Sequence, residues 1–115
     1  MKDWNAIQKR YLRDALPTRL GGIAANLSRV KSFAARDANR EAVASLLEES
    51  KFFIEWTAGE AEIDTPAELV ELQVQLALWG CAWDEIWGDS THRQLLASTS
   101  DKWSQRVLVL SGLLD

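Results

Sequence analysis

TPAELVELQVQLALWGCAWDEIWG, the segment formed by residues 65–88, predicts a long helix with a marked beginning and end. Thr65 is a good N-cap, Pro66 suits the first helical position, and Glu68 completes a capping box. Gly88 is well placed to end the helix in a left-handed turn. We therefore expect one continuous helix that runs from this cap to Gly88.

Apolar side chains occupy two sides of this expected helix. Placed at 100° per residue, one stripe holds Leu69, Leu72, Leu76, Trp79, Trp83, Ile86 and Trp87. A second strip, on about the opposite side, holds Val70, Val74, Ala77 and Cys81. A helix that is apolar on two sides is buried on two sides, either between its own neighbours or between two subunits. We expect Leu76 and Trp83 to be almost fully buried.

Four further helices are expected from caps, helix breakers and the same periodicity. They cover about residues 3–16, 18–36, 40–58 and 90–111. Pro17 ends the first because the residue before a proline avoids the helical region, and Thr18 caps the second. In the last helix, Leu95 is expected on the inner side and Leu96 at its edge.

The chain as a whole is expected to be one helical domain. No stretch of four or more residues between turn signals alternates apolar and polar side chains, so no strand pattern competes. Short links between long helices predict an all-α fold, an up-down antiparallel four-helix bundle with an additional N-terminal helix. The length of 115 residues fits a single domain spanning residues 1–115.

Composition places the chain among ordinary globular proteins, with 47% hydrophobic and 26% charged residues. Cys81 is the sole cysteine, so we interpret it as a small buried hydrophobe in a reducing compartment. The first residues lead into mixed charges rather than a signal peptide, and no run approaches the length of a membrane span. We therefore expect a cytoplasmic protein that does not bind a membrane.

The sequence offers no pattern typical of an active site or a cofactor site. His92 is the only histidine, so a His-rich metal site is excluded, and no metal or cofactor is expected. A Cys81–His92 pair would be separated by about two helical turns, too far for a hydrogen bond. Gly21-Gly22 indicates either a close contact with another helix or an anion site flanked by Arg19. We expect no catalytic residues and predict that the protein is not an enzyme.

The aromatic residues admit more than one role. Four tryptophans lie on inner stripes and are either core residues or the lining of a pocket for an apolar ligand: Trp79, Trp83, Trp87 and Trp103. Phe52 and Trp56 lie one turn apart, away from the inner stripe of their helix. They form either a contact surface or a second internal layer against the N-terminal helix.

These observations favour a non-enzymatic interaction or regulatory module that associates with itself or another protein. The interface candidates, which together exceed what one small bundle needs to bury, are Phe52, Trp56, Val70, Val74 and Cys81. The alternative is a binder of a small apolar ligand in a cavity lined by tryptophans. In the leading interpretation the protein is a homodimer.

Charge is divided unevenly along the chain. Residues 1–40 carry nine Lys or Arg against three acids, a net charge of +6, whereas residues 41–115 carry four against fourteen, a net charge of −10. Because the basic part is not accompanied by an aromatic platform or a recognition-helix pattern, we expect it to face the acidic part within the fold or across a dimer.

This interpretation predicts negligible binding to nonspecific DNA at physiological salt, where counterions compete with phosphate contacts. Fluorescence anisotropy of a labelled duplex, titrated with the protein, measures this directly. Tight binding that weakens steeply with added salt would contradict the prediction and move the functional site to the basic helices.

Overall fold

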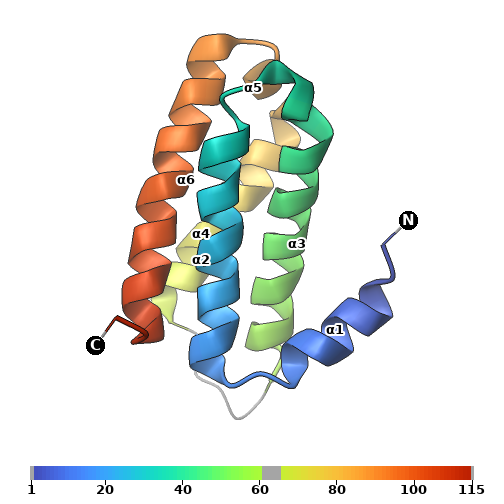
Figure 1. Ribbon diagram of the computed structural model, residues 1–115, viewed down its shortest axis with the longest axis vertical. Helices are drawn as coiled ribbons and strands as arrows, with labels where there is room; N and C mark the ends of the chain where they lie inside the picture. Colours follow the sequence, from blue (N-terminus) through green and yellow to red (C-terminus); the bar gives the residue numbers. More distant parts are fainter. Residues whose placement is uncertain (1, 61–65, 115) are drawn as a thin grey trace.

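The computed structural model describes residues 2–60 and 66–114, which form six α-helices and one short 3-10 helix, with no strand in those ranges (Figure 1). The elements are α1 (Trp4–Leu12), α2 (Leu16–Phe33), η1 (Asp37–Asn39), α3 (Arg40–Ala58), α4 (Ala67–Cys81), α5 (Trp83–Trp87) and α6 (Ser90–Ser111). The prediction of an all-helical fold is therefore confirmed.

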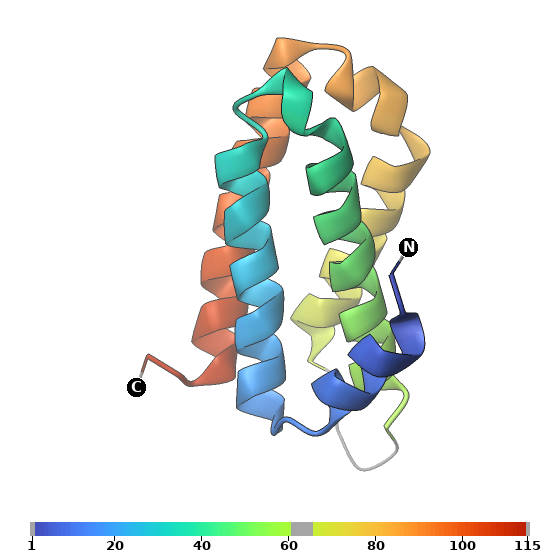
Figure 2. The same ribbon diagram turned by 45° about the vertical axis from the view of Figure 1, so that its right-hand side comes forward.

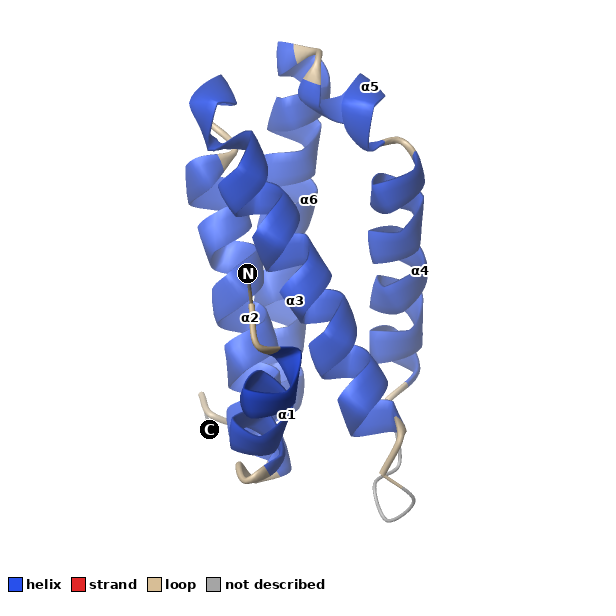
Figure 3. Ribbon diagram, turned by 90° about the vertical axis from the view of Figure 1, so that its right-hand side faces the viewer, coloured by secondary structure: helices blue, strands red, loops and turns tan. Residues whose placement is uncertain are grey.

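The molecule measures 41 × 33 × 20 Å along its three principal axes. The four longer helices, α2, α3, α4 and α6, run along the longest of these axes. Short α5 joins α4 to α6 at one end, and α1 lies against the opposite half of α3 (Figures 1 and 2). Figure 3 shows α4 at one outer edge of the molecule, with α3 and α6 on one side of it. This position leaves one side of α4 turned away from the other helices.

The most extensive helix contact joins α2 to α6. Small side chains line it: Ala24 is almost fully buried, as are Ser100 and Ser104 on the facing helix. The Ser104 hydroxyl donates to the carbonyl oxygen of Ala24 at 2.7 Å, which satisfies a buried polar group inside the seam. Small residues let two helix backbones approach closely, which agrees with the extensive contact between these two helices.

Only a side-chain atom of Leu113 comes close to the glycine pair, so the close contact with another helix, one of its two expected interpretations, is not seen among the described residues. A Cβ atom at Gly21 would lie 2.9 Å from Cδ1 of Leu113, in the turn after α6. Gly22 has open space where its Cβ would be. The contact therefore involves the first glycine of the pair and the segment that follows α6.

The prediction that Pro17 ends the first helix is wrong. The first helix ends at Leu12, and Pro17 lies in the first turn of α2, where a missing backbone N–H costs no hydrogen bond. Arg19 closes the junction instead, because its buried guanidinium donates to the carbonyl oxygens of Leu12 and Asp14, each at 2.8 Å. The long side chain of Arg19 therefore does what a helix cap would do.

The single helix expected up to Gly88 is divided into α4 and α5 at Ala82. Gly88 has φ −71° and does not end a helix in the left-handed region, whereas Gly112, after α6, has φ 73°. The break lets the indole N–H of Trp87 donate to the carbonyl oxygen of Asp37 at 2.9 Å, a tertiary bond that periodicity does not reveal. Thr65, the predicted cap, lies outside the described residues.

Burial follows the prediction on α4 and departs from it after the break. Leu76 is 5% exposed, as expected, but Trp83 is only partly buried because it follows the change of direction at Ala82. Its ring packs against that of Trp87 instead, with centroids 5.3 Å apart. On α6, Trp103 is buried as expected, but near the beginning of the helix Leu95 is 64% exposed and Leu96 is buried instead.

Truncation of the buried side of α4 tests its part in the core. Leu76→Ala should lower the free energy of unfolding by roughly 2–5 kcal/mol, because it removes buried methyl groups and leaves a cavity. Val74→Ala, on the exposed side of the same helix, should change it by less than about 0.5 kcal/mol. Urea denaturation followed by circular dichroism measures both, and equal midpoints for the two variants would contradict the assignment.

Candidate interaction surfaces

The outer stripe of α4, defined by Val70, Val74, Ala77, Leu78 and Cys81, is exposed. Its three large apolar side chains are more than half exposed, Val70 at 51%, Val74 at 56% and Leu78 at 60%. The opposite side of the same helix is buried through Leu69, Leu72, Leu76 and Trp79. The second apolar strip predicted from the sequence is therefore not covered by helices of its own chain.

Cys81 corrects one expectation. It was predicted to be buried, but its side chain is exposed near the end of α4. The reason is that the strip to which it belongs faces solvent rather than a neighbouring helix. Leu78, which sequence reasoning left out of that strip, lies at its edge and could have been found from the same helical projection.

No charged residue occurs between Leu72 and Trp83, so this stretch of the α4 surface is uncharged. Charged groups stand beside it instead. Arg106 of α6 donates to Glu71 at 3.2 Å on one side, and Glu48 and Lys51 of α3 stand on the other. The outer stripe is thus an apolar strip bordered by polar groups, an arrangement typical of protein interaction sites.

A groove of about 490 Å³ lies between α3 and α4, next to the outer stripe. Its lining residues are Ala44, Leu47, Glu48, Lys51, Leu76, Ala77, Gly80, Cys81 and Trp83. Small residues keep the α4 wall low, since a Cβ atom at Gly80 would meet nothing within 4 Å. Ala77 and Cys81 belong both to the groove and to the outer stripe, so the two features are continuous.

The four tryptophans predicted as core or pocket residues are distributed over different surroundings. Trp79, Trp87 and Trp103 are each at most 8% exposed and belong to the core. Trp83 lines the groove between α3 and α4, whereas the edge of Trp79 lines a separate hollow of about 260 Å³ beside α5 and α6. Arg106 covers the ring of Trp103, with its guanidinium carbon 4.1 Å from the ring centroid.

Phe52 and Trp56, the other interface candidates, lie on α3 beneath α1. The ring of Trp4 packs on Phe52 with centroids 4.5 Å apart and meets the edge of Trp56 at 6.3 Å. Tyr11 stacks on Phe53 at 4.1 Å on the same side of α3. Both candidates are partly buried, which fits the second internal layer that the sequence left open.

Burial also governs the chemistry of Tyr11. Desolvation raises the pKa of its phenol to about 12, although its hydrogen bond to Thr57 Oγ1 at 3.0 Å and the nearby Arg19 act in the opposite direction. Arg19 itself pairs with Glu60 at 3.0 Å and also binds backbone carbonyls. Because its guanidinium is engaged by its own chain, the structure gives no support to an anion site beside Gly21-Gly22.

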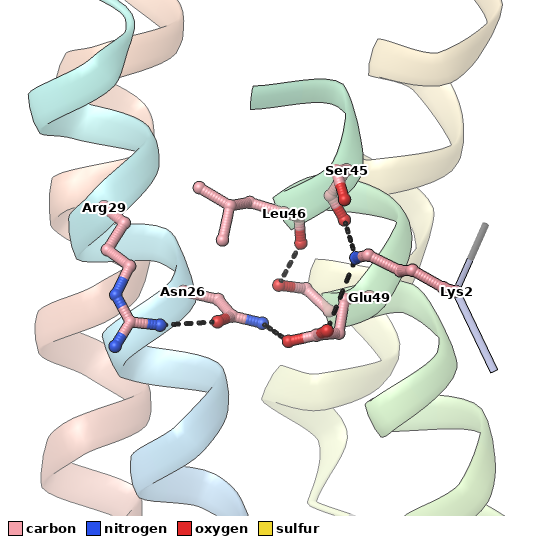
Figure 4. Close-up of polar contacts among 7 residues, drawn as sticks. Lys2, Asn26, Arg29, Ser45, Leu46 and Glu49 are labelled. Atoms are coloured by element: carbon pink, nitrogen blue, oxygen red, sulfur yellow. Dashed lines mark hydrogen bonds and ion pairs between the residues drawn. The ribbon is translucent and has the colours of Figure 1, made fainter. Parts of the chain in front are cut away.

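A polar network links the N-terminal segment to α2 and α3 (Figure 4). Glu49 accepts from Lys2 Nζ at 3.4 Å and from the amide of Asn26 at 3.1 Å. Arg29 donates to Asn26 Oδ1 at 3.4 Å, so both ends of this buried amide are bonded. The network reads as a satisfied structural contact, because each polar group in it bonds to another part of the chain.

Ion pairs join the basic and acidic parts of the chain. Among the described residues, four pairs connect residues 1–40 to acids beyond residue 41: Lys2–Glu49, Arg19–Glu60, Lys31–Asp101 and Arg40–Asp84. The expectation that the two regions face each other within the fold is supported by these contacts. Most of the pairs are partly exposed, and such pairs contribute little stability individually.

Two features are absent from the described residues. Within residues 2–60 and 66–114, no three His, Cys, Asp or Glu side chains gather where they could hold a metal ion. None of the helices in these ranges has the length and apolar character needed to cross a bilayer.

Comparisons with protein-family models, with curated proteins and with solved structures found no match for this chain.

The single tyrosine provides a direct test of how α1 is packed. Tyr11 should ionise with a pKa of about 12 in the folded protein, against about 10 in denaturant. Because the folded state retains the neutral phenol while the unfolded state ionises, this contribution to stability is complete below pH 10 and is lost as the pH rises toward 12. The phenolate absorbance, followed against pH beside the helical signal, measures both values.

Trp4→Ala should lower the pKa of Tyr11 toward its ordinary value, because it loosens the aromatic contact that holds α1 on α3. Asn5→Ala, an exposed position on the same helix, serves as the matched control and should leave the pKa unchanged. A pKa near 10 in the folded wild-type protein would show that Tyr11 is accessible and that α1 is not packed as described.

Proposed function

We propose that this chain is a non-enzymatic interaction module that forms a homodimer through the outer stripe of α4. The observation that carries the proposal is the exposure of Val70, Val74 and Leu78 in a row on one helix face, which carries no charged residue between Leu72 and Trp83. Isolated exposed apolar residues are normal on protein surfaces, but a continuous apolar strip bordered by polar residues is typical of a binding surface.

The size of the stripe favours weak association. The distance from Val70 to Cys81 spans about three helical turns, roughly 17 Å along the axis. A surface of this length supports a small interface, and small interfaces bind weakly. We therefore infer a dimer that forms in the range of tens of micromolar, equivalent to about −6 to −7 kcal/mol.

The outer stripe is a better candidate than Phe52 and Trp56. Both aromatic residues already pack against Trp4, so a partner would have to displace α1 to reach them fully. Val70 and Val74 need no such rearrangement. The remaining interface candidate, Cys81, lies on the stripe itself.

We also infer that the four long helices form the expected up-down antiparallel bundle, with α1 as an addition. Contacts between α2 and α3, α3 and α4, α4 and α6, and α6 and α2 close a ring of four helices. The sequence-based interpretation of one domain is consistent with this ring. Localisation in the cytoplasm remains a proposal that rests on composition.

The alternative function, binding of a small apolar ligand, is favoured by one observation. The groove between α3 and α4 has a volume in the range of small-molecule sites and is lined by Trp83 and Leu76. A ligand there would touch one of the four tryptophans predicted to line a pocket. It would cover Ala77 and Cys81 as well, so ligand binding and dimerisation would compete for the same surface.

A charge placed on the stripe tests the leading proposal. Val74→Glu should abolish the dimer, because it would bury an unpaired carboxylate in an apolar contact. Leu114→Glu, at an exposed apolar position beyond α6, is the matched control and should dimerise like the wild type. Sedimentation equilibrium at tens of micromolar gives the mass, and circular dichroism verifies that both variants remain helical.

The proposal fails if the wild-type protein sediments as a monomer throughout that concentration range. It also fails if Val74→Glu and the control have the same mass as the wild type, since the dimer would then use another surface.

A further inference from the structure

The helix α1 lies outside the ring of contacts that joins α2, α3, α4 and α6. Among the described elements it makes extensive contact with α3 alone, and none of the contacts that close the ring involves it (Figure 2). Its nine residues are too few for a helix to be stable by itself in water, so α1 is helical only while it is packed. The order of α1 therefore depends on the ring, whereas the ring closes without α1.

The contact between α1 and α3 differs at its two ends. At the beginning of α1, Trp4 packs on Phe52 and Trp56, and all three side chains are partly exposed. At the end of α1, Tyr11 is buried and stacks on buried Phe53. The tighter end of α1 is thus the one that joins α2, and the rest of the helix lies on a partly exposed aromatic surface.

Polar contacts add little at the beginning of α1. Lys2 Nζ lies 3.4 Å from Glu49 Oε2 in an ion pair that is partly exposed, and such pairs contribute little stability. Glu49 keeps another partner without Lys2, because it accepts from the buried amide of Asn26 at 3.1 Å. Release of the N-terminal segment would therefore leave the polar contact between α2 and α3 intact.

One side chain of α2 fastens the other end of α1. The buried guanidinium of Arg19 donates to the carbonyl oxygens of Leu12 and Asp14, and its carbon lies 5.7 Å from the centroid of the Tyr11 ring. It also contacts both carboxylate oxygens of Glu60, just after α3, at 3.0 and 3.1 Å. A buried charge that loses its counter-charge is costly, so Glu60 holds Arg19 in this position.

We infer that α1 is a hinged strap, which opens as a unit about residues 13–15 while the four-helix ring stays folded, and that Arg19 with Glu60 is the latch that keeps it closed. Local opening at a free energy below that of global unfolding is the behaviour of an element with few buried contacts. Opening uncovers an aromatic surface on α3, formed by Phe52, Phe53 and Trp56. The strap goes beyond the proposed dimer, since the outer stripe of α4 takes no part in it.

Limited proteolysis with trypsin measures the opening, because the protease cleaves chain that has transiently left its helix. The bonds after Lys9 and Arg10 lie within α1, and those after Lys51 and Lys102 lie within α3 and α6; all four side chains are exposed. Each cleavage rate, divided by that of a free peptide of the same sequence, should be at least about a hundredfold higher in α1 than in the ring. Equal rates would show that α1 opens only with the whole protein and would overturn the inference.

Urea below the unfolding transition separates the strap from the ring in the wild-type protein. Cleavage after Lys51 should rise steeply with urea, because global unfolding exposes a large surface. Cleavage after Lys9 should rise only slightly, because opening of α1 exposes a small one. Equal slopes for the two bonds would contradict separate opening.

Trp4→Ala tests whether α1 opens as a unit. It should raise cleavage after Lys9, at the other end of the helix, about tenfold, because it removes an aromatic contact of the closed strap. Asn5→Ala, an exposed position on the same helix, is the matched control and should leave that rate unchanged. If Trp4→Ala also leaves it unchanged, only the last turn of α1 frays and no strap opens.

Glu60→Gln tests the latch. It removes the counter-charge of Arg19 and should raise cleavage after Lys9 about tenfold. Glu55→Gln, at an exposed position of α3, changes the charge by the same amount and should have no effect. Equal rates for the two variants would remove Glu60 from the latch, and circular dichroism verifies that both remain helical.

Discussion

The close contact between α2 and α6 is the constraint on which the rest of this structure depends. Ala24, Ser100 and Ser104 are buried between these helices, and the Ser104 hydroxyl bonds to the backbone of α2. Small residues bring the two backbones together and leave the larger apolar side chains, such as Ile23 and Leu27, for the contacts with the remaining helices. The positions of α3 and α4 follow from that division, since each packs on a side of the pair that remains open.

Among the four long helices, α4 makes the least extensive contacts with the rest of the chain. It contacts α3 and α6 much less extensively than α2 contacts α6, and one of its sides is turned outward (Figure 3). Its inner residues, including Leu69 and Leu72, are fully buried, so the helix is held firmly in place. A rigid helix that presents Val70 and Val74 to solvent has the properties of a preorganised binding surface, because little conformational entropy is lost when a partner covers it.

Sequence reasoning predicted the features that depend on neighbouring residues of one helix. It missed the features that depend on contacts between residues far apart in the chain. The inner side of α4, with Leu69 and Leu76, was predictable because helical periodicity alone places those residues together. The break at Ala82 was missed because the apolar periodicity continues through it, and the bond that it allows, from Trp87 to the carbonyl oxygen of Asp37, joins residues 50 positions apart in the chain. Periodicity also identified both apolar sides of α4. It shows that a side of a helix is apolar, but it does not show whether another helix covers that side. For this reason the exposure of Cys81 could not be predicted from the sequence.

The seam between α2 and α6 also bears on the order of events during synthesis. The hydrogen bond from Ser104 to Ala24 joins residues 80 positions apart, and the elements between them leave the ribosome before α6 does. A nascent chain that has released α2, α3 and α4 still lacks the helix that covers Ala24, so the side of α2 that packs on α6 stays uncovered until α6 is made. Contacts of such long range slow folding, because the intervening chain must be ordered before the contact forms. Among the described helices, α6 is therefore both the last to be made and the one that covers this side of α2.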